Sequence, residues 1–538
     1  MSPYGSEPVC VSPSSPEAKP CPEAEQAAAA ATPPEAGGTP AHHHELRTDH
    51  LLTDIGQRSL RGGAVMFSAQ ALKVLAQFGA VVVLVRLLPP AAFGLIAMTA
   101  ALYAVLDPLR DLGLSAATIQ KPDLAHAEIS TLFWVNFGAG TLLAAALFLG
   151  APLVAAFYHQ PELVAVTRWI ALGFVLNGFC AQHWALLRRQ MRFTAVATLE
   201  TSAEILGFGV AIALALAGAG YWALVVQRLI GPSLIAPGCW ILCRWRPSRP
   251  AWAPGIGGLL GFGGSLAGTS LMSLFSRSID QMAIGWFWGP SVLGLYDRAT
   301  KLLISPLNNI MLPLYSIGMP TLSRLTVDEQ RYRRAFGEIL EKLAMVTMPA
   351  AAGIMATAYW TTEILFGHRW IAAAPLVAWF ALVAAYQPSL DACALLYMTQ
   401  MRARELLRAG MIDAALRILA IACALPYGAT AVAAALAVSG LLVRAPIVFW
   451  LATRRGPVGL AQVYRTLLPS LLAALGVAGS IAVERAFVLP HDTAAEPGML
   501  LAVPTGILAA AAVFWLVPRS RHSLIRFCGA RRLLWGGA

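Results

Sequence analysis

The sequence predicts an all-α, polytopic membrane protein with about 14 transmembrane helices. Hydrophobic residues make up 57% of the 538-residue chain and charged residues only 12%, with a mean hydropathy of +0.64. An average soluble domain has about a quarter charged residues. Apolar runs of about 18 residues or more, the length that crosses a bilayer core, recur along nearly the whole chain. A water-soluble fold cannot cover this much apolar surface.

The expected helices form two lobes of six, followed by two further C-terminal helices. Their predicted spans are residues 62–87, 91–116, 128–156, 162–186, 195–218, 220–243, 257–287, 291–317, 335–360, 371–396, 407–425, 429–452, 465–487 and 498–517. Several exceed 20 residues, so we expect tilt or extension beyond the membrane.

Positive charge predicts the direction in which the helices cross. The loops on one side, counted with the C-terminal tail, carry 22 Lys and Arg residues, whereas the alternate loops carry three. Cytoplasmic loops are the ones enriched in Lys and Arg, so both termini are expected in the cytoplasm. The net charge of +11 then reflects topology and attraction to anionic inner-leaflet lipids rather than nucleic acid.

The composition divides the chain into five regions. Residues 1–55 are rich in Ala, Pro and Glu and are expected to be a disordered cytoplasmic tail. Residues 56–250 are the predicted N-lobe and residues 251–456 the predicted C-lobe. Residues 457–518 hold helices 13 and 14, and residues 519–538 form a basic cytoplasmic tail.

A short internal repeat supports the two-lobe division. Pro90, Gly94 and Leu95 in PPAAFGL recur two hundred positions later in GPSVLGL, residues 289–295. Repeats with an even number of helices enter the membrane in the same direction, and such parallel repeats build transporters. We expect each copy to be the outward turn between the first two helices of its lobe. The prolines that follow, Pro108 and Pro306, should kink the second helix of each lobe.

Longer stretches resemble a known family. They are DLGLSAATIQ (111–120), NGFCAQHWALLRRQMRF (177–193), SRSIDQMAIGWFWGPSVLGLYDRATKLLISPLNNI (276–310), PTLSRLTVDEQRYRRAF (320–336) and LFGHRW (365–370). These stretches are similar to Wzx-type polysaccharide flippases of the multidrug/oligosaccharidyl-lipid/polysaccharide superfamily, particularly the exopolysaccharide and capsule (colanic-acid-like) exporters.

The resemblance implies a fold, a cargo and a location. The superfamily fold has two six-helix lobes that open alternately. The implied activity is to flip undecaprenyl-pyrophosphate-linked oligosaccharide repeat units across the bacterial cytoplasmic (inner) membrane, for exopolysaccharide, lipopolysaccharide or capsule synthesis. The expected partners are this lipid-linked oligosaccharide, anionic inner-leaflet lipids, and the polysaccharide polymerase and export machinery.

Four charged residues near the second copy of the repeat are the predicted substrate-binding residues. A charge at a helix centre costs about 2.5–3.5 kcal/mol on insertion scales, so charges within spans are functional candidates. Helices 7 and 8 are expected to be neighbours, which would place Arg277, Asp280, Arg298 and Lys301 in one polar patch with excess positive charge. Cations suit a pyrophosphate. The alternative is that Asp280 and Lys301 form a purely structural pair.

Seven other charges within the spans are candidate gating or coupling residues. They are Lys73, Asp107, Arg110, Asp111, Glu200, Glu204 and Asp391. A structural role is the alternative for each of them. Glu200 and Glu204 share a helix face. Arg228, at a similar depth on the next helix, is expected to pair with Glu204.

Other function classes fit the sequence less well. It contains no GxSxG, Walker loop or metal-ligand spacing, so we predict no enzyme, no cofactor and no metal site. An ion-coupled multidrug exporter of the same superfamily remains an alternative, although cationic drugs favour an acidic cavity. A membrane-embedded polysaccharide polymerase or ligase is a further alternative. Such an enzyme needs a sizeable outer loop, and the outer loops here are short.

Overall fold

The structure is a computed structural model that describes residues 55–121, 125–249, 256–487, 495–517 and Arg521. Side chains are described from Ser68 onward, except for short stretches, the longest being residues 256–277. The two tails predicted at residues 1–55 and 519–538 lie almost entirely outside these ranges. The secondary structure within them is helical.

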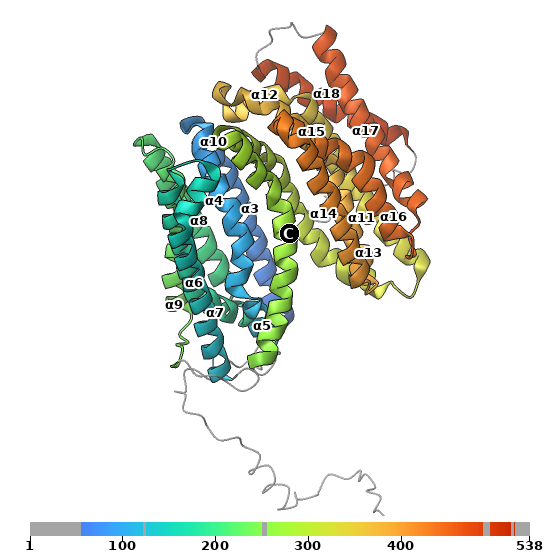
Figure 1. Cartoon of the computed structure of the whole chain (residues 1–538). Coiled ribbons are helices and arrows are strands. Elements are labelled where there is room, and N and C mark those ends of the chain that lie inside the picture. Colours follow the sequence, from blue (N-terminus) through green and yellow to red (C-terminus); the bar gives the residue numbers. More distant parts are fainter. Residues whose placement is uncertain (1–54, 122–124, 250–255, 488–494, 518–520, 522–538) are drawn as a thin grey trace, which may run out of the picture.

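The first half of the chain forms one group of helices, drawn blue to green in Figure 1. They are α3 (Ile55–Leu87), α4 (Pro90–Asp111), α5 (Leu114–Gln120), α6 (His126–Tyr158), α7 (Leu163–Arg189), α8 (Phe193–Leu216) and α9 (Trp222–Leu242). α6 packs on α7, and α8 packs between α3 and α9. Apart from the added short helix α5, these helices correspond to the predicted helices 1–6, although α3 starts at Ile55 rather than 62 and α4 ends at Asp111 rather than 116.

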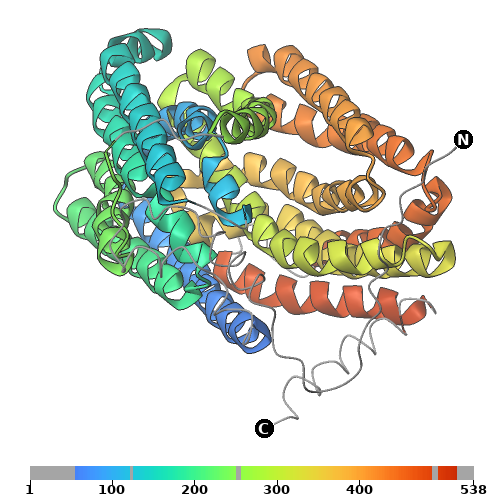
Figure 2. The same ribbon diagram turned by 90° about the horizontal axis from the view of Figure 1, so that it is seen from below.

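The second half forms a separate group, drawn yellow to red. It comprises α11 (Glu329–Ala356), α12 (Ala358–Phe366), α13 (Ala374–Thr399), α14 (Ala403–Ala424), α15 (Ala429–Ser439) and α16 (Ala445–Thr453). The last two helices, α17 (Leu460–Phe487) and α18 (Ala495–Leu516), pack on each other, and α17 also packs along α11. Figure 2, seen from below, shows the two groups side by side.

The helix α10 (Ile256–Arg324) lies between the groups and reverses direction at Gly289. Gly289 has φ 76° and ψ −176°, a conformation that a residue with a Cβ rarely adopts. Tyr296 in the second arm donates a hydrogen bond to Asp280 in the first, at 2.9 Å, so the two arms run antiparallel. The predicted turn between helices 7 and 8 is therefore confirmed, with Gly289 as its pivot.

In the part of the chain that the structure describes, twelve helices are long and apolar enough to cross a membrane. The all-α, multi-pass fold class is confirmed. The number of crossings is established only as about twelve, short of the 14 predicted.

The glycines shared by the two copies of the repeat lie beyond the turns rather than in them. Gly94 lies inside α4 and Gly294 inside the second arm of α10, beyond each turn. Both are buried where α4 packs along α10. A glycine in a helix lowers its stability, so its value here is the close approach of two backbones.

The kink predicted at Pro108 is confirmed as a break in the helix. α4 ends at Asp111, three residues beyond this proline, and Leu112 and Gly113 follow with left-handed φ values of 48° and 67°. The chain then starts the short helix α5 in a new direction.

Two turns at the opposite end of the molecule from the α3–α4 turn share the sequence Gln-Met-Arg. The methionines, Met191 and Met401, both have left-handed φ values, of 54° and 57°. The arginine that follows each one donates to a backbone carbonyl at the end of another helix. Arg192 reaches Leu242 at 2.7 Å, and Arg402 reaches Ala452 at 3.2 Å. The two halves therefore use the same clamp.

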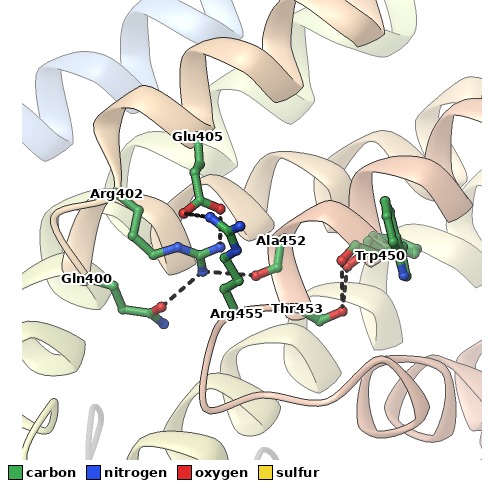
Figure 3. A network of polar contacts seen from close by, with 8 residues as sticks. Gln400, Arg402, Glu405, Trp450, Ala452, Thr453 and Arg455 are labelled. Atoms are coloured by element: carbon green, nitrogen blue, oxygen red, sulfur yellow. Dashed lines mark hydrogen bonds and ion pairs between the residues drawn. The ribbon is translucent and has the colours of Figure 1, made fainter.

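The second clamp is part of a larger network, shown in Figure 3. Arg402 also donates to Gln400 at 3.1 Å and to Glu405 at 2.7 Å. Arg455, beyond α16, completes the network with its guanidinium 3.6 Å from Glu405. The network ties the start of α14 to the end of α16.

Candidate functional site

A cavity of about 660 Å³ opens among α3, α4, α8, α9 and the second arm of α10. Most of its wall is apolar, but seven charged side chains line it. They are Lys73, Glu200, Glu204, Arg228, Asp297, Arg298 and Lys301. Four cations against three carboxylates leave the cavity with excess positive charge.

One charged cluster lies on the second arm of α10. Asp297 is buried; its carboxylate accepts a hydrogen bond from Arg298 at 2.6 Å and forms an ion pair with Lys301 at 2.7 Å. Arg298 also stacks on Phe93 of α4, 4.7 Å from the ring centroid. Asp297 therefore holds both cations in place, while the Lys301 side chain remains 43% exposed.

Arg228 on α9 differs from the other cavity cations. It is exposed, and no carboxylate among the described residues lies within ion-pair distance of it. The charged groups that act on it through space are Asp297 and Arg298. The predicted pair with Glu204 is wrong, since that carboxylate has another partner.

The partner of Glu204 is Lys73, at 2.9 Å. Lys73 also lies 3.7 Å from Glu200, and Arg188 lies 3.6 Å from the other oxygen of Glu200. Two carboxylates thus face two cations across α3, α7 and α8. This second cluster is electrically balanced, whereas the cluster around Asp297 is positive.

Asp280 does not share the patch predicted for it. Its carboxylate accepts from Arg417 at 3.0 Å and from the Tyr296 hydroxyl at 2.9 Å. It therefore joins α10 to α14 and does not line the cavity. The predicted alternative, a pair between Asp280 and Lys301, is wrong as well, because Lys301 forms its ion pair with Asp297. Arg277 lies outside the residues whose side chains are described.

The remaining candidates also lie away from the cavity. Arg110 pairs with Asp107 at 3.1 Å, and Ser115 donates to Asp111, all close to the α4 break. Asp391 accepts from Gln387 at 2.9 Å within α13. These contacts fit the structural alternative.

Two charged residues that line the cavity, Asp297 and Arg228, were not predicted as site residues from the sequence. The i,i+4 spacing of Asp297 and Lys301 was a readable signal for their pairing. Nothing near Arg228 in the sequence could have indicated its role, because it lacks an ion-pair partner only since Glu204 pairs with the distant Lys73. Among the described residues, no group of three or more His, Cys, Asp and Glu side chains could hold a metal ion.

Comparison with known proteins decides the family. The profile of a family described as "Polysaccharide biosynthesis protein" matches residues 83–375, more than half of the chain. The chain belongs to the polysaccharide biosynthesis protein family. The predicted resemblance to Wzx-type flippases is confirmed by this match together with the relatives described next.

Several curated proteins are similar to this chain. The teichuronic acid biosynthesis protein TuaB of Bacillus subtilis is 28% identical over 51% of this chain and 57% of its own length. The lipopolysaccharide biosynthesis protein WzxC of Escherichia coli is 24% identical over 55% and 60%. The succinoglycan biosynthesis transport protein ExoT of Rhizobium meliloti is 24% identical over 57% and 62%. Each match covers less than two thirds of the relative.

Solved structures extend the likeness of the fold. A structure of the lipid II flippase MurJ in an inward closed conformation has a TM-score of 0.63 and 10% identity, covering 85% of this chain and 98% of that one. An inward-facing multidrug resistance MATE family transporter has a TM-score of 0.51 and 14% identity, covering 75% and 99%. At these identities the likeness shows the fold alone.

Proposed function

We propose that this protein is a flippase that moves undecaprenyl-pyrophosphate-linked oligosaccharide repeat units across the cytoplasmic membrane by alternating access. The proposed pathway is exopolysaccharide, lipopolysaccharide or capsule synthesis. The observation that carries the proposal is a cavity with four cations and three carboxylates, within a polysaccharide biosynthesis family. A pyrophosphate loses hydration on leaving the headgroup region, and such cations replace it.

The proposal includes the topology. Each arm of α10 is long enough to cross the bilayer, and the two arms would raise the number of crossings to 14. The lobes are then residues 56–250 and 251–456, with residues 457–518 as an added pair of helices. Both termini lie in the cytoplasm, where the basic loops meet anionic lipids. The polymerase and export machinery would receive the cargo on the other side.

A multidrug exporter of the same fold is less consistent with the cavity. Cationic drugs need uncompensated carboxylates. The three cavity carboxylates each lie within 4 Å of at least one cation, at 2.6–3.7 Å. An anionic headgroup fits this charge balance better.

Deletion of the gene tests the proposal. Lipid extracts of the deletion strain should accumulate complete single repeat units on undecaprenyl pyrophosphate, detected by mass spectrometry, and polymer export should stop. The wild-type gene should restore export. A gene that carries Arg168→Gln should restore export equally well, because Arg168 is exposed, stacks on Phe148 and does not line the cavity. Normal export without accumulated intermediates would contradict the proposal.

A further inference from the structure

The charges of the cavity are not evenly distributed. On one wall Glu200 and Glu204 are balanced by Lys73, which lines the cavity, and by Arg188, which reaches Glu200 from outside the cavity lining. The other wall carries Arg228, Arg298 and Lys301 but one lining carboxylate, Asp297, which pairs with Arg298 and Lys301, so two positive charges are uncompensated. Charges of one sign held together in a low-dielectric site repel each other, so an anion that enters there is stabilised.

The three cations are not equally available to that anion. Asp297 already holds both Arg298 and Lys301, and Arg298 also stacks on Phe93. Arg228 alone has a guanidinium that makes no ion pair or hydrogen bond with the described residues while lining the cavity. Its planar fork of donors matches two oxygens of one phosphate.

The space beside Arg228 is open. Gly231, one turn further along α9, also lines the cavity, and a Cβ built on it would have no atom within 4 Å. A group entering the cavity can therefore approach this face of α9. A free cation and the room to reach it occur together.

We propose that Arg228 is the primary phosphate-binding residue of the cavity, that it takes one phosphate of a lipid-linked pyrophosphate, and that Lys301 takes the other. Asp297 is the positioning residue that aims Lys301. This inference rests on the proposed function and adds the residues that distinguish a pyrophosphate from a monophosphate. A pyrophosphate diester carries one negative charge on each phosphate, which matches the two uncompensated positive charges. A monophosphate has a single phosphate group, so it cannot give one phosphate to each of the two cations.

Binding to the purified full-length chain in lipid nanodiscs tests the assignment. The probes are undecaprenyl pyrophosphate, undecaprenyl monophosphate and undecaprenol. The wild-type chain should bind the pyrophosphate most tightly. Arg228→Gln should weaken pyrophosphate binding roughly 10- to 100-fold and remove most of the preference over the monophosphate, because one charged hydrogen-bonded contact is lost and only Lys301 remains to bind either probe. Arg228→Lys should retain part of the preference.

Two further variants keep the test decisive. Gly231→Leu fills the space beside Arg228 without changing a charge, and it should also weaken pyrophosphate binding. Arg168→Gln removes a cation outside the cavity, and it should bind as the wild type does. Thermal unfolding of each variant reports whether it is folded.

The outcomes separate the two levels of the proposal. If Arg228→Gln and Gly231→Leu keep the wild-type preference for pyrophosphate, Arg228 is not the phosphate-binding residue, and the flippase proposal stands. If the wild-type chain binds undecaprenol as tightly as undecaprenyl pyrophosphate, the proposed function itself is contradicted.

Discussion

Gly94 and Pro290 lie so close that a Cβ on Gly94 would be 1.7 Å from the Pro290 carbonyl oxygen. The reverse contact is nearly the same, since a Cβ on Gly294 would be 1.9 Å from the carbonyl oxygen of Pro90. Each copy of the repeat thus places its glycine against the proline of the other copy. The repeat marks one symmetric helix crossing between the two halves of the chain.

Other contacts close the same end of the molecule. Trp370, in the 3-10 turn after α12, donates to the carbonyl of Val85 at 2.8 Å and meets Phe93 edge to face at 5.4 Å. Phe366, at the end of α12, packs into the same cluster and lines the cavity. In the proposed topology this is the outer end, and it is closed.

Replacing either glycine should therefore prevent this closure. Gly94→Ala and Gly294→Ala each place a methyl group against backbone that cannot give way, so α4 and α10 must separate. Ala97 lies one turn below Gly94 and lines the cavity but is 1% exposed. In a cysteine-free chain that carries Ala97→Cys, we expect labelling by an external, membrane-impermeant thiol reagent to rise several-fold, and polymer export to fall.

Gly138→Ala is the control for this prediction. Gly138 lies within α6, and a Cβ built on it meets nothing within 4 Å. It should leave export and labelling unchanged, and it should stabilise the helix by about 0.5–1 kcal/mol. Unchanged labelling and export in Gly94→Ala would show that this crossing opens by another route or not at all.

The helices could be predicted from the sequence, because each depends on a local property. An apolar run of sufficient length is a span wherever it occurs, and the turns between such runs follow from short polar, Gly or Pro segments. The pairing of charges could not be predicted in the same way. Asp280 and Asp297 lie on facing arms of one helix, and only their rotation about the axis decides which one meets the cavity. A single residue step turns a side chain by about 100°.

The pair of Asp280 and Arg417 should act structurally. It joins α10 to α14, and the Asp280 side chain is only 4% exposed. Asp280→Asn leaves a partly buried guanidinium, 24% exposed, without its counter-charge, which should lower the free energy of unfolding by up to about 3–5 kcal/mol. Combining it with Arg417→Gln should recover most of this loss. Thermal unfolding in detergent measures both effects.

A measurement of polymer export distinguishes a structural role of Asp280 and Arg417 from a role in transport. The double variant should still export polymer, since neither residue lines the cavity. A stable double variant that exports nothing would place the pair in the transport mechanism.

The Arg402 clamp should contribute to stability at the other end of the molecule. Arg402→Gln removes its bonds to Glu405 and to the carbonyl of Ala452, so the start of α14 separates from the end of α16. We expect the unfolding temperature to fall by about 2–4 °C. Arg192→Gln should do the same in the first half of the chain, through the carbonyl of Leu242.

Arg404→Gln is the matched control for the clamp. Arg404 is exposed, two residues beyond Arg402, and should be replaceable without effect. An equal fall in unfolding temperature for Arg404→Gln would mean that charge near the membrane surface, rather than the clamp, is responsible.

Polymer export should depend on the positive charge of Lys301. Its ion pair with Asp297 allows a charge-swap variant to test whether the pair is only structural. In the proposed mechanism Lys301 faces the pyrophosphate while Asp297 holds it from behind, at 2.7 Å. Lys301→Arg preserves the charge and the pairing, so export should remain substantial. Lys301→Gln should reduce export roughly 10-fold or more with normal protein level, since one charged contact is lost and Asp297 loses a counter-charge. Lys301→Glu should be worse, because a second carboxylate then repels the cargo.

The swap of Asp297→Lys with Lys301→Asp restores the pair but points the carboxylate at the cavity, and it should not restore export. Export recovered by the swap would make the pair structural, and full export by Lys301→Gln would remove Lys301 from the substrate path. Polymer yield per unit of membrane protein measures each case.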